Sequence, residues 1–337
     1  MPLERVTGRL IERSFDVGSE AELRLNNVRG TVRITGTSTT TIRARLEVDP
    51  ERRLSDEDVE RAPIEIEHDG HRVAIRVLSD KAIMGWFERR AGPPNVLCVL
   101  EVPARTQSSV STVSADVSLA GLDVGQTANT VSGKIVVTKV TGDLRLNTVS
   151  GSAIVTETSG AVRWNTVSGD LIVRDSKTTE LKANAVSGTT EATVRNGLPG
   201  GATVQTVSGD LRLFVPADFG CEAQLSSMSG NARCALPMQV LESKRGRWRA
   251  TVNGGGPQVR LSSMSGSLYL SAVDGAGAAQ FERPASQPVG KTQTAPAAGD
   301  ERLQILRQVE RNEITIEEGL ARLDTLRRKA PTSEEVL

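Results

Sequence analysis

Aromatic side chains are scarce in this chain. Phenylalanine, tryptophan and tyrosine make up only 3% of its 337 residues, although 38% of the residues are hydrophobic. A large globular interior normally takes much of its buried area from aromatic rings. The shortage therefore favours a thin core of aliphatic side chains, such as the core of a solenoid built from stacked strands.

The chain also lacks a net charge, because its 41 basic residues balance its 41 acidic ones. No global field therefore directs the protein onto nucleic acid or an anionic membrane. The only cysteines, Cys98, Cys221 and Cys234, lack the spacing of a metal site and suggest a reducing compartment. No apolar run reaches the roughly 18 residues of a membrane span, and no signal-like stretch follows Met1. We expect a cytoplasmic protein, or one held at the inner face of the membrane through a partner.

Patterns that would indicate catalysis or a cofactor are absent as well. The sequence shows no Ser/His/Asp set, no Cys/His pair and no phosphate-binding glycine loop. Its two histidines, His68 and His71, flank the Asp69-Gly70 turn of a hairpin predicted over residues 64–77. A hairpin tip is a poor metal site, so we expect them to be exposed polar residues. We predict no cofactor, no metal and no small-molecule substrate.

What the sequence does contain is a short phrase that returns from Ser111 to Leu270. Its fullest copies are Asn129-Thr-Val-Ser-Gly133, Asn147-Thr-Val-Ser-Gly151 and Asn165-Thr-Val-Ser-Gly169. The phrase serines follow one another at 18, 18, 18, 19, 21, 21 and 36 residues; they are Ser114, Ser132, Ser150, Ser168, Ser187, Ser208, Ser229 and Ser265. A period of this size indicates stacked supersecondary units.

Each unit reads as two strands joined at glycine corners. Apolar residues alternate with polar ones between the phrases, which is typical of a strand with one buried face. The predicted core positions are Ile135, Val137, Leu144, Leu146, Leu171, Val173, Leu211 and Leu213. We predict an all-β fold, a parallel β-helix or β-solenoid of about 18–21-residue coils in which each strand pairs with its equivalent one coil along.

The asparagines of the phrase allow two interpretations. In a stack, Asn129, Asn147, Asn165 and Asn184 would lie about 4.8 Å apart and form hydrogen bonds from coil to coil. The same polar row could instead be a ligand-binding surface, as repeated rows are in some β-helical carbohydrate or ice binders. The spacing does not separate the two.

Two segments outside the regular repeats are candidates for interaction. Residues 81–95 contain an apolar cluster that includes Trp86 and Phe87, and they serve either as a cap on the solenoid or as an anchor for a partner or a membrane surface. Residues 241–252 read as an outlying hairpin in which basic residues, Arg247 among them, surround Trp248. Such a tip could contact nucleic acid, but the neutral chain makes this the weaker interpretation.

The domain boundaries follow from composition. Residues 1–271 form the predicted solenoid domain, with irregular coils and the hairpin in 1–103 and regular repeats in 104–271. Residues 272–299 have the composition of a flexible linker, and residues 331–337 form a tail. A helical hairpin is predicted over 300–330, with Leu306 and Val309 on one apolar stripe and Leu320 and Leu323 on the other. Stripes this narrow favour docking on a protein partner or self-association through 300–330.

The returning Thr-Val-Ser-Gly-Asp phrase and the closing Gly254-Gly-Gly-Pro-Gln-Val-Arg-Leu261 resemble a bacterial adhesin-like family of β-strand-repeat proteins of unknown function, over roughly residues 20–272. Residues 301–323 resemble the short SHOCT-like helical hairpins that accompany such repeats in envelope-stress proteins. The resemblance implies an architecture and a place near the envelope, and it supplies no catalytic residues.

These observations favour a non-enzymatic scaffold or interaction protein. One alternative is a carbohydrate-binding or carbohydrate-active β-helix, in which Asp143, Asp170 and Asp210 would occupy equivalent corner positions and supply paired carboxylates. Another is a solenoid that forms filaments by end-to-end stacking.

Overall fold

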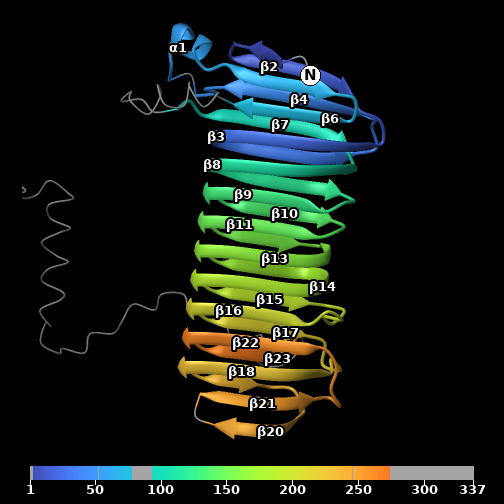
Figure 1. Cartoon of the computed structure of the whole chain (residues 1–337), viewed down its shortest axis with the longest axis vertical. Coiled ribbons are helices and arrows are strands. Elements are labelled where there is room, and N and C mark those ends of the chain that lie inside the picture. The colour runs from blue at the N-terminus through green and yellow to red at the C-terminus, as the bar shows by residue number, and fades with distance from the viewer. Residues whose placement is uncertain (1–2, 52, 78–92, 245, 274–337) are drawn as a thin grey trace, which may run out of the picture. The chain divides into compact units, whose positions relative to one another are not determined.

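The computed structural model describes residues 3–51, 53–77, 93–244 and 246–273, which form a two-faced β-solenoid (Figure 1). The chain runs along one face, turns at a corner, returns along the other face and turns again. In the regular part, equivalent residues lie 18 positions apart along the chain. We call the sheet that carries the Asn-Thr-Val-Ser phrase face 1 and the opposite sheet face 2.

Each face is one ladder of neighbouring strands, and three long strands bend at a corner to contribute to both faces. In spatial order, face 1 consists of β1 (Leu3–Val6), β5 (Ile64–Asp69), β6 (Arg72–Val77), the first part of β3 (Glu20–Thr37), the first part of β8 (Arg105–Leu122), β9 (Gln126–Ser132), β11 (Leu144–Ser150), β13 (Ser159–Ser168), the second part of β14 (Leu171–Ser187), β16 (Ala202–Ser208), β22 (Gln258–Ser265), β18 (Cys221–Ser229), β21 (Arg247–Val252) and β20 (Met238–Lys244).

Face 2 lies opposite. Its strands, in spatial order, are β2 (Leu10–Asp16), β4 (Thr41–Val48), β7 (Val96–Pro103), the second parts of β3 and β8, β10 (Ile135–Val140), β12 (Ala153–Thr156), the first part of β14, β15 (Thr190–Val194), β17 (Leu211–Val215), β23 (Leu268–Ala272) and β19 (Ala232–Cys234).

The core is the thin layer between the two faces. Successive side chains of a strand point to opposite sides, so every second residue of each strand enters this layer. All eight predicted core positions do so, and none is more than 2% exposed. The largest fully buried side chain is Trp164; aliphatic residues supply most of the core. This arrangement explains how the chain buries a core with so few aromatic rings.

The repeated serines lie in register, as predicted. Ser150 is aligned with Ser132 on one side and with Ser168 on the other, through parallel pairings of β11 with β9 and β13. Coils of 19 and 21 residues keep the same register, because Ser187 is aligned with both Ser168 and Ser208. The extra residues are accommodated by irregularities elsewhere in the coil, such as the register shift between Gly160 and Val162.

The stacking order departs from the predicted one near the end of the repeats. We expected each coil to lie on the coil that precedes it in the chain. Instead, β22 and β23 lie between the coil of β16 and β17 and the coil of β18 and β19. Figure 1 shows orange β22 between the yellow strands β16 and β18. The prediction fails here because the chain skips one position, forms β18 to β21, and then returns to fill the gap.

At the opposite end of the stack the pairing changes from parallel to antiparallel. Strands β2, β4 and β7 pair antiparallel on face 2, and β1, β5 and β6 do so on face 1. The predicted hairpin of residues 64–77 is therefore confirmed. Its neighbouring strands join the ladder as well, so this end, for which irregular coils and a hairpin were predicted, is built largely from antiparallel strands.

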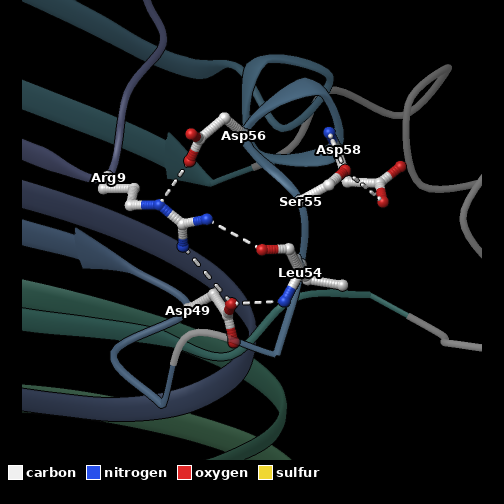
Figure 2. A network of polar contacts seen from close by, with 6 residues as sticks. All are labelled: Arg9, Asp49, Leu54, Ser55, Asp56 and Asp58. Atoms are coloured by element: carbon white, nitrogen blue, oxygen red, sulfur yellow. Dashed lines mark hydrogen bonds and ion pairs between the residues drawn. The ribbon is translucent and has the colours of Figure 1, made fainter.

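A polar network fixes a short helix, α1 (Asp56–Glu60), over this end (Figure 2). The Arg9 guanidinium donates to the carboxylate of Asp56 at 2.7 Å and to the Leu54 carbonyl at 2.7 Å, and it lies 3.5 Å from the buried carboxylate of Asp49. Asp49 in turn accepts the Leu54 N–H, and the Ser55 hydroxyl caps the helix by accepting the Asp58 N–H. Arg9, which immediately precedes β2, thus connects the start of that strand to the helix.

Several predicted features lie outside the described residues. They are most of the loop at residues 81–95, with Trp86 and Phe87, most of the linker at 272–299, the helical hairpin at 300–330 with Leu306, Val309, Leu320 and Leu323, and the tail at 331–337.

Candidate interaction face

An asparagine ladder runs along face 1, as the stacking interpretation predicted. The side-chain amide of Asn147 donates to the Asn129 carbonyl oxygen at 2.8 Å, Asn165 donates to Asn147 at 2.9 Å, and Asn184 donates to Asn165 at 3.0 Å. The two central amides, Asn147 and Asn165, therefore each donate to one neighbour in the stack and accept from the other. This hydrogen bonding gives the asparagines a structural role.

A second column on face 1 is apolar and exposed. In spatial order it consists of Val113, Val131, Val149, Val167, Val186, Val207, Met264 and Met228. Their exposed fractions run from 41% at Val113 to 81% at Met228. At about 4.8 Å per coil the column is about 34 Å long. Soluble monomers rarely expose an apolar strip of this regularity without an interaction to explain it.

Our sequence reasoning missed this valine–methionine column. The signal was available in the two-residue period of the strand. Leu144 and Leu146 point inward, so Thr148 must point inward as well, and it is only 7% exposed. The valine after it, Val149, must then point outward. The phrase places its threonine in the core and its valine in solvent, which is the reverse of what polarity alone would suggest.

The inward threonines leave a polar group in the core layer. The hydroxyls of Thr130, Thr148, Thr166 and Thr206 are buried and have no hydrogen-bond partner in the structure. At the equivalent position of β18, the Ser227 hydroxyl donates to the Gly266 carbonyl at 3.0 Å. A hydroxyl at this position of the coil can therefore reach a corner carbonyl, as that of Ser227 does.

The predicted equivalence of three aspartates is wrong. Asp170 and Asp210 follow Ser-Gly corners and precede face 2 strands, whereas Asp143 precedes β11 on face 1 and lies at the opposite corner. The error arose because Gly-Asp occurs at both corners of the coil. Asp143 therefore cannot pair with the other two carboxylates.

Each of these carboxylates has a structural partner. Asp170 accepts the Thr189 N–H at 2.7 Å, Asp210 accepts the Ser267 N–H at 2.9 Å, and Asp143 accepts the Ala161 N–H at 3.1 Å. In every case the donor belongs to the neighbouring coil. The aspartates thus join coils at the corners, where the main chain leaves the sheet ladder.

The predicted hairpin of residues 241–252 is present as β20 and β21. Arg247 is exposed, but Trp248 is half-buried and packs against the end of the core. Its side chain lies in the same inward row as Leu225 of β18. The arginines of β21 therefore face solvent while the indole helps to close the solenoid.

A groove of about 430 Å³ lies on the outer side of face 1 near this hairpin. Gln224 lies opposite Arg260 on one neighbouring strand and opposite Arg249 on the other, and Glu222 and Glu242 also line the groove. The lysine ammonium of Lys244, which donates a hydrogen bond to Glu242, lowers the pKa of that carboxyl. The lining offers donors and acceptors for a polar ligand, and none of its residues is aromatic.

The candidate metal and thiol residues are dispersed. Within the described ranges, no group of three or more His, Cys, Asp and Glu side chains is placed to hold a metal ion. His68 stacks at a tilt on Phe15, with ring centroids 5.2 Å apart, and its Nε2 lies 2.9 Å from the Gly70 carbonyl oxygen. Cys98 and Cys221 are free and buried, and desolvation raises the pKa of each thiol to about 12.

No helix in the described part of the chain has the length and apolarity to cross a membrane.

The fold and its repeated corners define a class of protein. Residues 20–271 match the model of the family described as Toastrack DUF4097, and the chain belongs to that family.

The solved structures that match this chain share little sequence with it. A "putative adhesin" from Bacteroides fragilis NCTC 9343 is 10% identical over 78% of this chain and 97% of its own, with a TM-score of 0.43. One from Parabacteroides distasonis ATCC 8503 is also 10% identical, over 78% of this chain and 98% of its own, with a TM-score of 0.30. A "putative cell adhesion protein" from Clostridium sporogenes ATCC 15579 is 9% identical over 80% and 99%, with a TM-score of 0.24. No curated protein matches the chain.

Proposed function

We propose that this protein is a non-enzymatic, adhesin-like scaffold that binds another protein through the valine–methionine column of face 1. The observation that carries the proposal is the register of eight exposed apolar side chains, one from each of eight neighbouring coils. Binding residues usually lie on loops. Here they lie on a sheet, where each coil places a valine or methionine at the same position, about 4.8 Å from the next. Because the sheet is already rigid, its contact residues lose little conformational entropy when a partner binds.

The chemistry of the column limits the partner. Neutral polar side chains border it on both sides, so the strip itself carries no charge. The corner serines lie on one side, and on the other side lie the asparagine ladder, Ser111, Gln205, Ser262 and Ser226. An apolar strip between neutral polar rows suits a protein surface with exposed aliphatic or aromatic side chains. The nearest cationic column, which includes Arg145 and Arg163, lies beyond the asparagines.

The corner carboxylates support a non-enzymatic role. Glycoside cleavage needs two carboxyl groups that face each other across a cleft. Asp170 and Asp210 instead accept main-chain N–H groups of neighbouring coils, and Asp143 does so at the other corner.

The location and the C-terminal segment form the finer part of the proposal. Three unpaired cysteines support a reducing compartment. The SHOCT-like resemblance of residues 301–323 supports a place at the inner face of the envelope, where residues 300–330 would bind a second partner or another copy in an envelope-stress response.

An affinity purification from cells that express the protein natively tests the proposal. The bait carries Val149→Lys and Val167→Lys, which place two charges in the middle of the column. The control carries Thr127→Lys and Thr203→Lys, which add the same charges to outward positions of face 1 outside the column. We expect the control to retain the partner of the wild-type chain and the column variant to lose at least about 90% of it, because an unpaired buried charge is costly.

Circular dichroism and thermal unfolding must show that both variants fold. If the column variant captures the same proteins in the same amounts as the control, the column is not the binding surface. A further bait that lacks residues 300–337 shows whether the predicted helical hairpin holds a separate partner.

A further inference from the structure

The solenoid ends in a step beyond β18. On face 1 two more strands follow it, first β21 and then β20. On face 2 the described ladder ends at β19, which has three residues and belongs to the same coil as β18. Face 1 therefore projects past face 2 by two strand widths, or about 10 Å.

The inner side of this projection is apolar and uncovered. One inward row runs from Cys221 through Val252 to Met238, and the exposed fraction rises along it from 0% and 0% to 43%. A parallel row ends at Val240, which is 52% exposed. The half-buried indole of Trp248 lies beside them. Side chains that elsewhere face the core layer are thus left in solvent on β20.

The step also carries two free sheet edges. Among the described strands, β20 pairs only with β21, and β19 pairs only with β23. Unpaired edges with exposed apolar side chains are the usual sites at which another chain adds to a sheet.

The other end of the solenoid also has two sheet edges, since among the described strands β1 pairs only with β5 and β2 only with β4, but it has neither a step nor an exposed inward apolar row. Strands β1 and β2 end their two faces together, and an ion pair of 2.7 Å between Arg13 and Glu4 connects them. The inward side chains of β2, Ile11 and Phe15, are only 4% and 8% exposed. Helix α1 buries Val59 in the core at this end, so the inward apolar side chains of β2 are not exposed to a second chain.

We infer that two copies of this chain join at their steps to form a closed, two-fold symmetric dimer. A two-fold axis parallel to the strands, midway between the faces, places face 1 of one copy in line with face 2 of the other. The projecting strands β21 and β20 of each copy then fill the two positions that face 2 of the partner leaves empty. Met238 and Val240 of both copies enter one continuous core.

The strand directions agree with this arrangement. Strand β20 is antiparallel to β21, which is antiparallel to β18, so β20 and β18 run the same way. Strand β19 runs back along face 2 in the opposite direction. Rotation about an axis parallel to the strands preserves their directions, so β20 of one copy meets β19 of the other in the antiparallel sense. The contact is isologous, and it closes after two copies.

The proposed contact is small. Each projecting strip is about 20 Å by 10 Å, and with both edges the pair buries on the order of 1,000 Å² in total. This lies at the low end of specific interfaces, so we expect a reversible dimer with a dissociation constant on the order of 1–100 µM. Because the contact is isologous, association through the steps stops at the dimer and does not continue into a filament.

Sedimentation equilibrium of the full chain, from about 1 to 300 µM, tests this inference over the expected range. We expect the wild-type chain to pass from monomer to dimer. Met238→Lys with Val240→Lys is expected to weaken association at least about 30-fold, because it places charges in the new core. Leu10→Lys, which adds a charge to the exposed side of β2 at the other end, is expected to leave the constant unchanged.

A milder variant, Met238→Gln with Val240→Thr, keeps the test valid if the lysine variant fails to fold. We expect it to retain the wild-type melting profile and to weaken association at least about fivefold. A wild-type chain that stays monomeric throughout, or that forms open filaments, overturns the inference. So does a dimer that both β20 variants leave intact, because association would then occur through another part of the chain.

Discussion

At the scale of single residues, the corner glycines decide whether coils can stack. Gly188 has a φ of 126°, and a Cβ at this position would overlap the carbonyl oxygen of Gly169 in the neighbouring coil. Glycine is required at this position for two reasons, its backbone conformation and its lack of a side chain. In an ordinary turn, glycine is required only for its backbone conformation.

We predict that Gly188→Ala lowers the free energy of unfolding by about 3–5 kcal/mol, from backbone strain together with forced separation of two coils. Gly70→Ala is the matched control, because Gly70 also has a positive φ, 56°, but has no atom within 4 Å of its added Cβ. It should cost only about 1–2 kcal/mol. Urea denaturation of both variants measures the difference. Equal losses would mean that coil contact adds nothing at the corner.

At the scale of elements, the asparagine ladder couples neighbouring strands through their side chains. Each central amide donates to the strand on one side and accepts from the strand on the other. The main-chain ladder already joins these strands, so the amides add a second, outer set of hydrogen bonds. Since the ladder is partly exposed, each bond contributes about 0.5–1.5 kcal/mol.

We predict a coupling free energy of about 0.5–1 kcal/mol between Asn147→Ala and Asn165→Ala in a double-mutant cycle, because the two amides are directly bonded. The pair Asn129→Ala and Asn184→Ala lies three coils apart in the same ladder and should be additive to within about 0.3–0.5 kcal/mol. Denaturant midpoints of the seven proteins provide both cycles. Coupling of the same size in the two cycles would contradict a ladder of independent pairwise bonds.

At the scale of the whole solenoid, the order of coils in space is not their order in the chain. Strand β22 is the second-last described strand in sequence, yet it lies between β16 and β18. Its amides and carbonyls are paired on both sides. Strand β20 precedes it in sequence but, among the described strands, pairs on one side only.

Native-state hydrogen exchange should follow position in the stack. We predict that amides of residues 258–265 exchange at least about tenfold more slowly than those of 238–244, a difference of about 1.4 kcal/mol in opening free energy. In a solenoid stacked in chain order, the later segment would fray first. Faster exchange of β22 than of β20 would therefore contradict the inserted coil. The measurement is made at a low concentration, where the dimer proposed above is dissociated and β20 is unpaired.

Much of this architecture was determined by the sequence alone. The period of the serines, the alternation of core residues such as Leu144 and Leu146, and the stacked asparagines all follow from local repetition, because identical units that bury the same side must align. The same reasoning placed the hairpins of residues 64–77 and 241–252, whose turn residues lie next to the strands that they join.

Only the tertiary structure decided the features that depend on which strands become neighbours. The insertion of β22 and β23, the separation of Asp143 from Asp170, the inward position of Trp248 and the step at the end of face 1 all involve pairings that skip a coil or end a ladder. The repeats are nearly identical, so a strand can pair equally well with several equivalents. The chain's own connections and the closure of its ends, which no local pattern records, select among them.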